Sequence, residues 1–195
     1  FNSPVHEFKN PGTYFVKLTA TSFTWNVSKD TIIQVNIGEV PLVDFRVKNA
    51  CQGSAIELTN VTIIGNGTLS YVWNFGDNSP TRTTTNATKT YTVPGPYLVT
   101  LTAEAGGCVA SKSKVVYQFA KPVADFNKVQ GECLNDEFLF ANASTIALGQ
   151  FGNKWDFDDL GNIASDLNTD YTFKSAGTKR VKLIAISEFG CMDSI

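Results

Sequence analysis

The four cysteines are the residues with the clearest chemistry. Cys51 and Cys108 are 57 residues apart, Cys133 and Cys191 are 58 apart, and corresponding members of the two pairs are separated by 82 and 83 residues. Four cysteines allow three pairings, and the repeated spacing favours Cys51–Cys108 and Cys133–Cys191. Reduced thiols are one alternative, and zinc is a poor one because CxxC is absent and His6 is the sole histidine. Disulfides predict an oxidising location, in the periplasm, on the cell surface or outside the cell.

The acidic residues and His6 are the other candidates for chemistry. Asp77 and the cluster Asp156, Asp158 and Asp159 could hold calcium, which takes several oxygen ligands. Their spacing does not match an EF-hand loop, so turn carboxylates that accept backbone N–H groups are the simpler interpretation. His6 could act as a general base, but no nucleophile motif accompanies it, and a triad needs three groups within reach. The sequence predicts no catalytic residue and no cofactor.

These residues belong to a repeat of about 82 residues. Tyr71-Val72-Trp73-Asn74-Phe75-Gly76-Asp77, with Tyr91 and 95–103 after it, returns as Trp155-Asp156-Phe157-Asp158-Asp159 with Tyr171 and 177–185. The second half also stands at the N-terminus, in 6–8 and 11–20. What every unit repeats is usually what the unit needs to fold, so the pattern indicates an array of modules rather than an enzyme. The shared positions, predicted to be structural, are Gly12, Tyr14, Trp73, Phe75, Asp77, Gly95, Trp155, Phe157, Asp159 and Gly177.

Alternation with a period of two predicts strands. In 96–105, the residues Tyr97, Val99, Leu101 and Ala103 alternate with Leu98 and threonines, which places the two sets on opposite faces. Strands are predicted near 42–48, 55–62, 69–75, 81–85, 88–92, 96–105 and 109–118, and the following repeat has the same plan. The fold class is therefore all-β, with tandem immunoglobulin-like sandwiches. Short linkers with one proline each, at 40–41 and 121–122, predict a stiff end-to-end rod.

The aromatic residues divide into two groups. Trp73 and Trp155 could stack on sugar rings, but each lies in the middle of an apolar strand face, which favours the core. Trp25 aligns with the second cysteine of the later repeats, so the first, partial repeat is predicted to lack the bridge. An exposed pair of Phe23 and Trp25 could contact a glycan or a neighbouring domain, and packing under the partial repeat is the alternative.

The repeated motif resembles the PKD (polycystic kidney disease) domain. Trp73-Asn74-Phe75-Gly76-Asp77-Asn78-Ser79 is similar to the hallmark W-x-F-G-D-G-S, and Tyr91 with 94–101 is similar to H-x-Y and P-G-x-Y-x-V-x-L. The resemblance covers the chain as 1–38 (the C-terminal half of a repeat), 39–119 (a repeat) and 120–195 (a repeat without its last strand). The third unit departs from the motif, with Asp158 where Gly76 stands and Lys179 where Tyr97 stands. We expect Lys179 to leave the core or to extend its ammonium group to solvent.

The resemblance implies immunoglobulin-like sandwiches that occur mostly outside cells. Such domains serve as spacers, as adhesion modules or as accessory modules of secreted hydrolases. The paired cysteines and the ending Cys191-Met192-Asp193-Ser194-Ile195 are similar to large surface proteins of Bacteroidota, which include gliding-motility adhesins exported by the type IX system. Asp30-Thr31-Ile32 and Asp193-Ser194-Ile195 are similar to the O-glycosylation pattern of that group, which makes Thr31 and Ser194 candidate sites.

Composition narrows the functional classes. Hydrophobic residues make up 43% of the chain and charged residues 17%, which is typical of a folded protein. The net charge is −2 without a basic run, so nucleic acid is not an expected partner. No apolar run approaches the ~18 residues of a membrane span. The chain opens inside a repeat and is expected to be a segment of a longer protein.

The predicted function is structural. The chain would be part of an extracellular stalk or adhesin that presents a binding tip, with neighbouring repeats, surface glycans or other surface proteins as partners. The alternative is an accessory substrate-binding module of a secreted polysaccharide- or protein-degrading enzyme, which a row of exposed aromatic residues would favour. An enzyme in its own right is the poorest interpretation.

Overall fold

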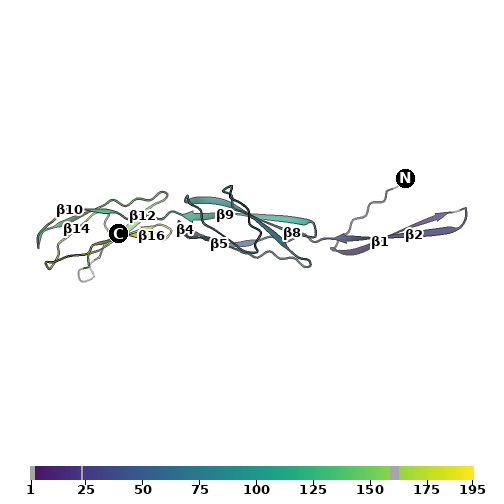
Figure 1. Ribbon diagram of the computed structural model, residues 1–195, viewed down its shortest axis with the longest axis horizontal. Coiled ribbons are helices and arrows are strands. Elements are labelled where there is room, and N and C mark those ends of the chain that lie inside the picture. The colour runs from purple at the N-terminus through teal and green to yellow at the C-terminus, as the bar shows by residue number, and fades with distance from the viewer. Residues whose placement is uncertain (1–2, 23, 159–162) are drawn as a thin grey trace.

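The computed structural model describes residues 3–22, 24–158 and 163–195, and every regular element in these ranges is a β-strand. The strands are arranged along one long axis, with a hairpin at the N-terminal end and two sandwiches after it (Figure 1). Among the described residues no helix is long and apolar enough to cross a membrane. The prediction of an all-β, immunoglobulin-like fold is confirmed.

The N-terminal hairpin consists of β1 (Gly12–Ser22) and β2 (Val27–Ile37). The two strands pair antiparallel over their whole length, from Gly12 opposite Ile37 to Ser22 opposite Val27. They form a two-stranded sheet, so both faces of the hairpin meet solvent. Leu18 and Ile33 are 69% and 61% exposed, although their alternation is that of a half-buried strand.

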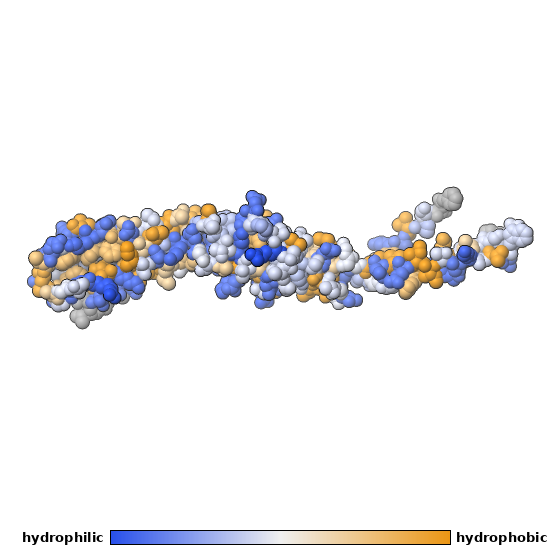
Figure 2. Space-filling model, in the orientation of Figure 1, coloured by the Kyte–Doolittle hydropathy of each residue, from blue (hydrophilic) through white to orange (hydrophobic). Residues whose placement is uncertain are grey.

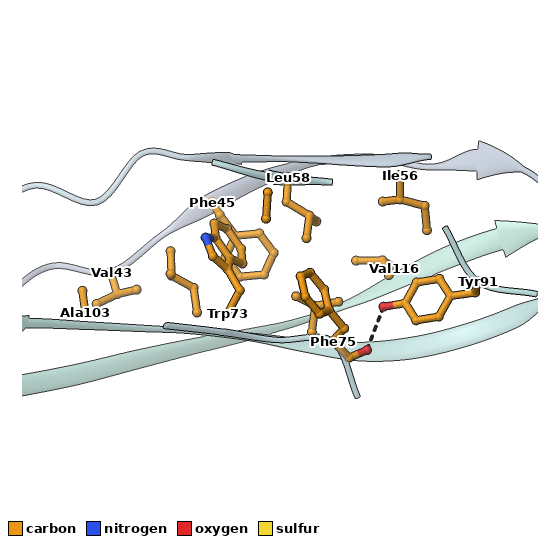
Figure 3. Packing of buried hydrophobic residues seen from close by; sticks show 12 residues of the cluster. Val43, Phe45, Ile56, Leu58, Trp73, Phe75, Tyr91, Ala103 and Val116 are labelled. Carbon is orange, nitrogen blue, oxygen red and sulfur yellow. Dashed lines mark hydrogen bonds between the residues drawn. The ribbon is translucent and has the colours of Figure 1, made fainter. Parts of the chain in front are cut away.

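The first sandwich packs two sheets face to face. One sheet has the order β3 (Phe45–Lys48), β5 (Ile56–Asn60) and β7 (Ala87–Lys89). The other has the order β4 (Ala50–Cys51), β9 (Cys108–Phe119), β8 (Gly95–Ala105) and β6 (Ser70–Asn74). Valine, isoleucine, leucine and aromatic side chains from the two inner faces meet between the sheets (Figure 3). The buried core consists of Val43, Phe45, Ile56, Leu58, Trp73, Phe75, Ala87, Tyr91, Val99, Leu101, Ala103 and Val116.

The second sandwich repeats this plan. Its sheets have the orders β10 (Phe126–Gln130), β11 (Phe138–Asn142), β14 (Thr169–Tyr171), and β13 (Ile163–Ala164), β12 (Phe151–Asp156), β15 (Lys182–Ser187), β16 (Met192–Ser194). Its buried cluster is Phe140, Trp155, Phe157, Phe173 and Leu183. β16 is much shorter than β9, and β4 pairs with the end of β9. A counterpart of β4 therefore has no strand to pair with in this chain.

One predicted strand is reduced to a single bridge. In 81–85, only Arg82 pairs with β6, through two backbone hydrogen bonds with Trp73 of 2.7 and 3.1 Å. The next carbonyl that could extend the pairing, that of Thr84, accepts the indole N–H of Trp73 at 2.9 Å. Since that carbonyl is turned toward the ring, the ladder stops there.

Both proline-containing linkers are tied into the sandwich that follows. After Pro41, the N–H of Leu42 donates to the carbonyl of Ile63 at 3.0 Å, and after Pro122 the N–H of Val123 donates to Thr145 at 2.8 Å. A proline has a fixed φ, and the next residue is held by the sheet. Few free torsions therefore remain between consecutive units.

Candidate functional site

The two repeated tryptophans are buried completely. Trp73 and Trp155 are both 0% exposed, and each packs edge-on against a phenylalanine of the facing sheet, Phe45 at 5.1 Å and Phe126 at 5.2 Å between ring centroids. Each indole N–H donates to a backbone carbonyl, that of Thr84 at 2.9 Å and of Asp166 at 3.0 Å. A ring enclosed in this way has no free face for a sugar. These residues hold the two sheets of each sandwich together.

Asp77 is held in a turn by charge and hydrogen bonds. Its carboxylate accepts the N–H and hydroxyl of Ser79 at 3.1 and 2.6 Å, and pairs with the ammonium of Lys89 at 2.6 Å. Burial raises the pKa of Asp77, but the hydrogen bonds from Lys89 and Ser79 outweigh it and hold the pKa below its usual value. The carboxylate is thus an ion-paired turn residue.

Acid should weaken this turn, and Asp77→Asn tests it. A carboxyl whose pKa is lower in the folded state contributes stability above its unfolded pKa of about 4, and that contribution is lost as pH falls through the folded pKa. We expect the unfolding free energy to depend less on pH below about 4 in Asp77→Asn than in the parent chain. Urea titrations across this range measure the slope. Glu57→Gln removes a more exposed ion pair with Lys48 and should leave the slope nearly unchanged; equal slopes in the parent and Asp77→Asn would contradict the assignment.

The turn after each tryptophan strand is the same even where the sequence departs. The N–H of Gly76 donates to the side chain of Asn74 at 2.9 Å, and the N–H of Asp158 donates to that of Asp156 at 3.1 Å. Gly76 has φ +73° and Asp158 has φ +51°, so both occupy the left-handed region. Asp158 is therefore a strained counterpart of the glycine.

A matched pair of substitutions measures that strain. Asp158→Gly should stabilise the second sandwich by about 1 kcal/mol. Gly76→Asp should destabilise the first by about 2 kcal/mol or more, because the left-handed conformation disfavours a side chain and a Cβ there would lie 2.4 Å from the carbonyl oxygen of Leu98. Denaturant midpoints of both variants give the two values, and a neutral result for both would show that the turn tolerates a side chain.

The predicted calcium cluster is not assembled in the described part of the chain. Asp156 uses a side-chain oxygen in the turn hydrogen bond to Asp158, and Asp159 lies outside the described residues. Among the described residues, no group of three or more His, Cys, Asp or Glu side chains is placed to share a metal ion.

The aromatic partner of each glycine-led strand is shifted in the second sandwich. Tyr91 is buried, stacks on Tyr97 at 3.5 Å and donates its hydroxyl to the carbonyl of Phe75 at 2.7 Å. In the second sandwich Phe173, rather than the predicted Tyr171, takes this buried place. Lys179 replaces the stacking tyrosine: its ammonium lies 5.6 Å from the Phe173 centroid and donates to the hydroxyl of Ser175 at 2.7 Å. As expected, its charged end leaves the core.

The partial repeat keeps the same aromatic contact without a core. Phe8 and Tyr14 have ring centroids 4.5 Å apart, and the Tyr14 hydroxyl donates to Asn10, as that of Tyr97 donates to Val93. His6 packs edge-on against Phe8 at 4.7 Å. The histidine is part of this aromatic contact.

Trp25 lies at the tip of the hairpin. It is 79% exposed, whereas Phe23 lies outside the described residues. The alignment of Trp25 with the cysteines is wrong. Register places Val27 opposite Ser22, as Cys108 lies opposite Ala105. The connection in the first hairpin is two residues longer, which shifted the alignment.

The predicted cysteine pairing is also wrong. Cys51 bonds Cys191, with Cα atoms 5.6 Å apart and 140 residues between them in sequence, while among the described residues Cys108 and Cys133 are free. The reason is that the two cysteines of one sandwich lie at its opposite ends. Cys51 pairs with Phe119 at the C-terminal end, and Cys108 begins β9 at the other end. The bond therefore crosses from one sandwich to the next.

Two further contacts accompany the bond at this join. Phe119 stacks on Phe189, which lies in the turn between β15 and β16, with centroids 4.2 Å apart. Lys121 in the linker pairs with Asp193 at 2.8 Å, and Asp193 also accepts the N–H of Ala124 at 3.0 Å. These two donors hold the pKa of Asp193 below its usual value. A covalent bond, a ring stack and an ion pair thus join the same two sandwiches.

The two candidate glycosylation residues lie on strands. Thr31 lies on β2 and Ser194 on β16, and both are exposed. Asp30, beside Thr31, pairs with Lys17 at 2.6 Å. Hydrophilic and hydrophobic side chains are mixed over the visible face of the sandwiches, while apolar side chains gather on the hairpin (Figure 2).

Comparison with known proteins identifies a family for the first sandwich. Residues 39–118 match the family described as PKD domain, whose members are non-catalytic modules. No curated protein matches the chain.

Solved structures that are similar to parts of the chain include two from Vibrio. The PKD1 domain of Vibrio anguillarum Epp is 25% identical, with a TM-score of 0.38, over 42% of this chain and 95% of that one. The PKD1 domain of the Vibrio cholerae metalloprotease PrtV is 29% identical, with a TM-score of 0.37, over 42% and 99%. The FN1–FN3 domains of chicken CNTN1 are 12% identical, with a TM-score of 0.36, over 93% and 76%.

Proposed function

We propose that this chain is a segment of an extracellular rod built from PKD units, 1–38, 39–119 and 120–195, that spaces or presents a binding element. The observation that carries the proposal is the join between the two sandwiches. A disulfide, a ring stack and an ion pair meet there, and the linker is held by proline and by the following sheet. Such a connection transmits force and keeps its direction, which is what a spacer requires.

The disulfide also supports a location outside the cytoplasm, where such bonds persist. A large cell-surface adhesin, such as those used in gliding motility and exported by the type IX system, is the setting that we propose on the resemblance of the sequence. Its partners would be neighbouring units of the same chain. In this setting Thr31 and Ser194, which are exposed, would be the residues to carry O-linked glycans.

Small-angle scattering tests the rod. The oxidised chain should have a single extended shape, and reduction of the disulfide should broaden the distribution of end-to-end lengths without unfolding the sandwiches. A broad distribution in the oxidised chain would contradict a stiff spacer. Reduction breaks no other contact at the join, so the ring stack and ion pair set how large the change is.

The second candidate is an accessory binding module, and the exposure of Trp25 favours it. A pull-down of the oxidised chain on insoluble polysaccharides, collagen and whole cells separates the two functions. Retention that Trp25→Ala abolishes would assign binding to the hairpin tip. Leu98→Ala, which removes an exposed apolar side chain from the outer face of β8, is the matched control. Absence of retention on every surface supports the spacer.

A further inference from the structure

The bonded cysteines occupy positions that the chain presents twice. Cys108 lies opposite Ala105 at the β8–β9 turn, and Cys191 lies opposite Ser187, whose N–H donates to its carbonyl at 2.8 Å. Ser187 corresponds to Ala105, because Trp155 pairs with Leu183 as Trp73 pairs with Leu101. Cys108 and Cys191 are therefore equivalent positions, which we call the turn cysteines.

Cys51 and Cys133 are equivalent in the same way. Each follows the first strand of its sandwich, β3 or β10. Each accepts a hydrogen bond at its carbonyl from the residue three positions later, Ser54 at 2.9 Å and Asp136 at 3.1 Å. We call these the end cysteines.

The observed bond joins an end cysteine to the turn cysteine of the next unit. Since Cys51 lies beside Phe119 and Cys191 follows the turn that contains Phe189, the bond closes the same join as the ring stack. The other two cysteines are the same two positions with no counterpart to bond. Cys108 lies at the preceding join: a Cβ added to Gly38 would be 2.7 Å from its sulfur. Cys133 is exposed.

Each unpaired cysteine lies close to a hollow where a neighbouring unit is incomplete. Next to Cys133 is a cavity of about 320 Å³ lined by apolar side chains that include Phe140, Phe173 and Val181. In the first sandwich the corresponding space holds the end of β9, where Val116 is buried and Gln118 bonds the N–H of Tyr91. Beside the β8–β9 turn is a cavity of about 300 Å³ between that turn and the uncovered hairpin.

We propose that Cys51–Cys191 is one rung of a ladder in which every end cysteine bonds the turn cysteine of the following unit of the same polypeptide. Cys133 then bonds a turn cysteine of a unit after it, and Cys108 bonds an end cysteine of a unit before it. In each rung two thiols lose two protons and two electrons. A small-molecule disulfide or an oxidised dithiol oxidase accepts them and is reduced to two thiols. Bonds of this type make every join covalent at two points, the backbone and the disulfide.

Two extended chains test the ladder. Ile195 corresponds to Lys112, because each pairs with the equivalent leucine, Leu183 or Leu101. A second copy of 113–195 placed directly after Ile195 therefore continues the strand in register and supplies a new turn cysteine. Phe8 corresponds to Tyr91, so a copy of 39–83 placed before Phe1 completes the first unit and supplies a new end cysteine.

Each extended chain is refolded in a glutathione redox buffer, alkylated and mapped by mass spectrometry. With the C-terminal extension, Cys133 should lose its alkylation and appear in a peptide linked to the new turn cysteine, while Cys108 stays alkylated. With the N-terminal extension the two cysteines should exchange these outcomes. Replacing the new cysteine by serine in each extended chain should restore alkylation.

The results distinguish the ladder from the proposed function on which it rests. In every sample the original Cys51–Cys191 peptide reports that the central join has folded. If that peptide forms while Cys133 and Cys108 remain alkylated in both extended chains, the ladder is wrong, although the rod proposal stands. A bond from Cys133 of one molecule to Cys108 of another would also overturn it, because the partner would then be a second chain.

Discussion

Trp73→Ala is expected to remove most of the stability of the first sandwich. Truncation of a fully buried tryptophan costs about 3–5 kcal/mol, and a domain of this size has about 5–10 kcal/mol in total. The variant loses the edge-on contact with Phe45 and leaves the carbonyl of Thr84 without its indole donor. Because Arg82 is bridged only to Trp73, the segment after β6 is expected to loosen as well. Denaturant unfolding with hydrogen exchange on β6 and β8 measures and localises the loss.

Trp25→Ala is the matched control, because it truncates the same side chain at an exposed site. Surface substitutions usually change stability by less than about 0.5 kcal/mol, so this variant should unfold like the parent chain. Trp73→Phe should be intermediate, since a ring remains between the sheets but the hydrogen bond to Thr84 is lost. A cost below about 1 kcal/mol for Trp73→Ala would be inconsistent with a tryptophan that joins the two sheets.

The fold could be predicted because its determinants are local. The alternation in 96–105 places Val99, Leu101 and Ala103 on one face, and the structure buries all three. The tryptophan motif repeats because each sandwich needs one large ring between its sheets. Spacing along the chain sets these features, and spacing is visible in the sequence.

The connectivity of the cysteines could not be predicted in the same way. An offset of 82 or 83 residues relates the end cysteines to one another and the turn cysteines to one another, and it is equally consistent with bonds inside each unit and with bonds between units. The deciding fact is that Cys51 and Cys108 lie at opposite ends of a sandwich. Sequence offsets hold no information about which end of a strand faces the next domain.

Turn length explains the misplacement of Trp25. The first hairpin connects Ser22 to Val27, whereas the second connects Ala105 directly to Cys108 through two glycines. Counting by a constant offset crosses this difference and arrives two residues early. The same limitation made Tyr171 rather than Phe173 the expected counterpart of Tyr91, because an aromatic residue stands at both positions.

Removal of the bond by Cys51→Ser with Cys191→Ser should destabilise the second sandwich by about 4 kcal/mol and leave the first nearly unchanged. When the second sandwich unfolds next to an intact first one, Cys51 remains paired with Phe119 through β4 and β9. The bond then closes a loop of roughly 70 residues, from Phe119 to Cys191, and chain entropy gives about 4 kcal/mol for a loop of this length. The short β16, which is held by three pairs to β15, should be the first strand to lose protection from hydrogen exchange.

The control is Cys108→Ser with Cys133→Ser, which removes two thiols and no bond. Its denaturation should match the parent chain within about 0.5 kcal/mol. The result that decides between the two pairings is the location of the loss. A bond inside each sandwich would make Cys51→Ser destabilise the first sandwich alone, whereas a bond across the join makes the same substitution destabilise a domain to which Cys51 does not belong. Hydrogen exchange that localises the loss to β12 and β15 would therefore show that the covalent bond couples consecutive units of the rod.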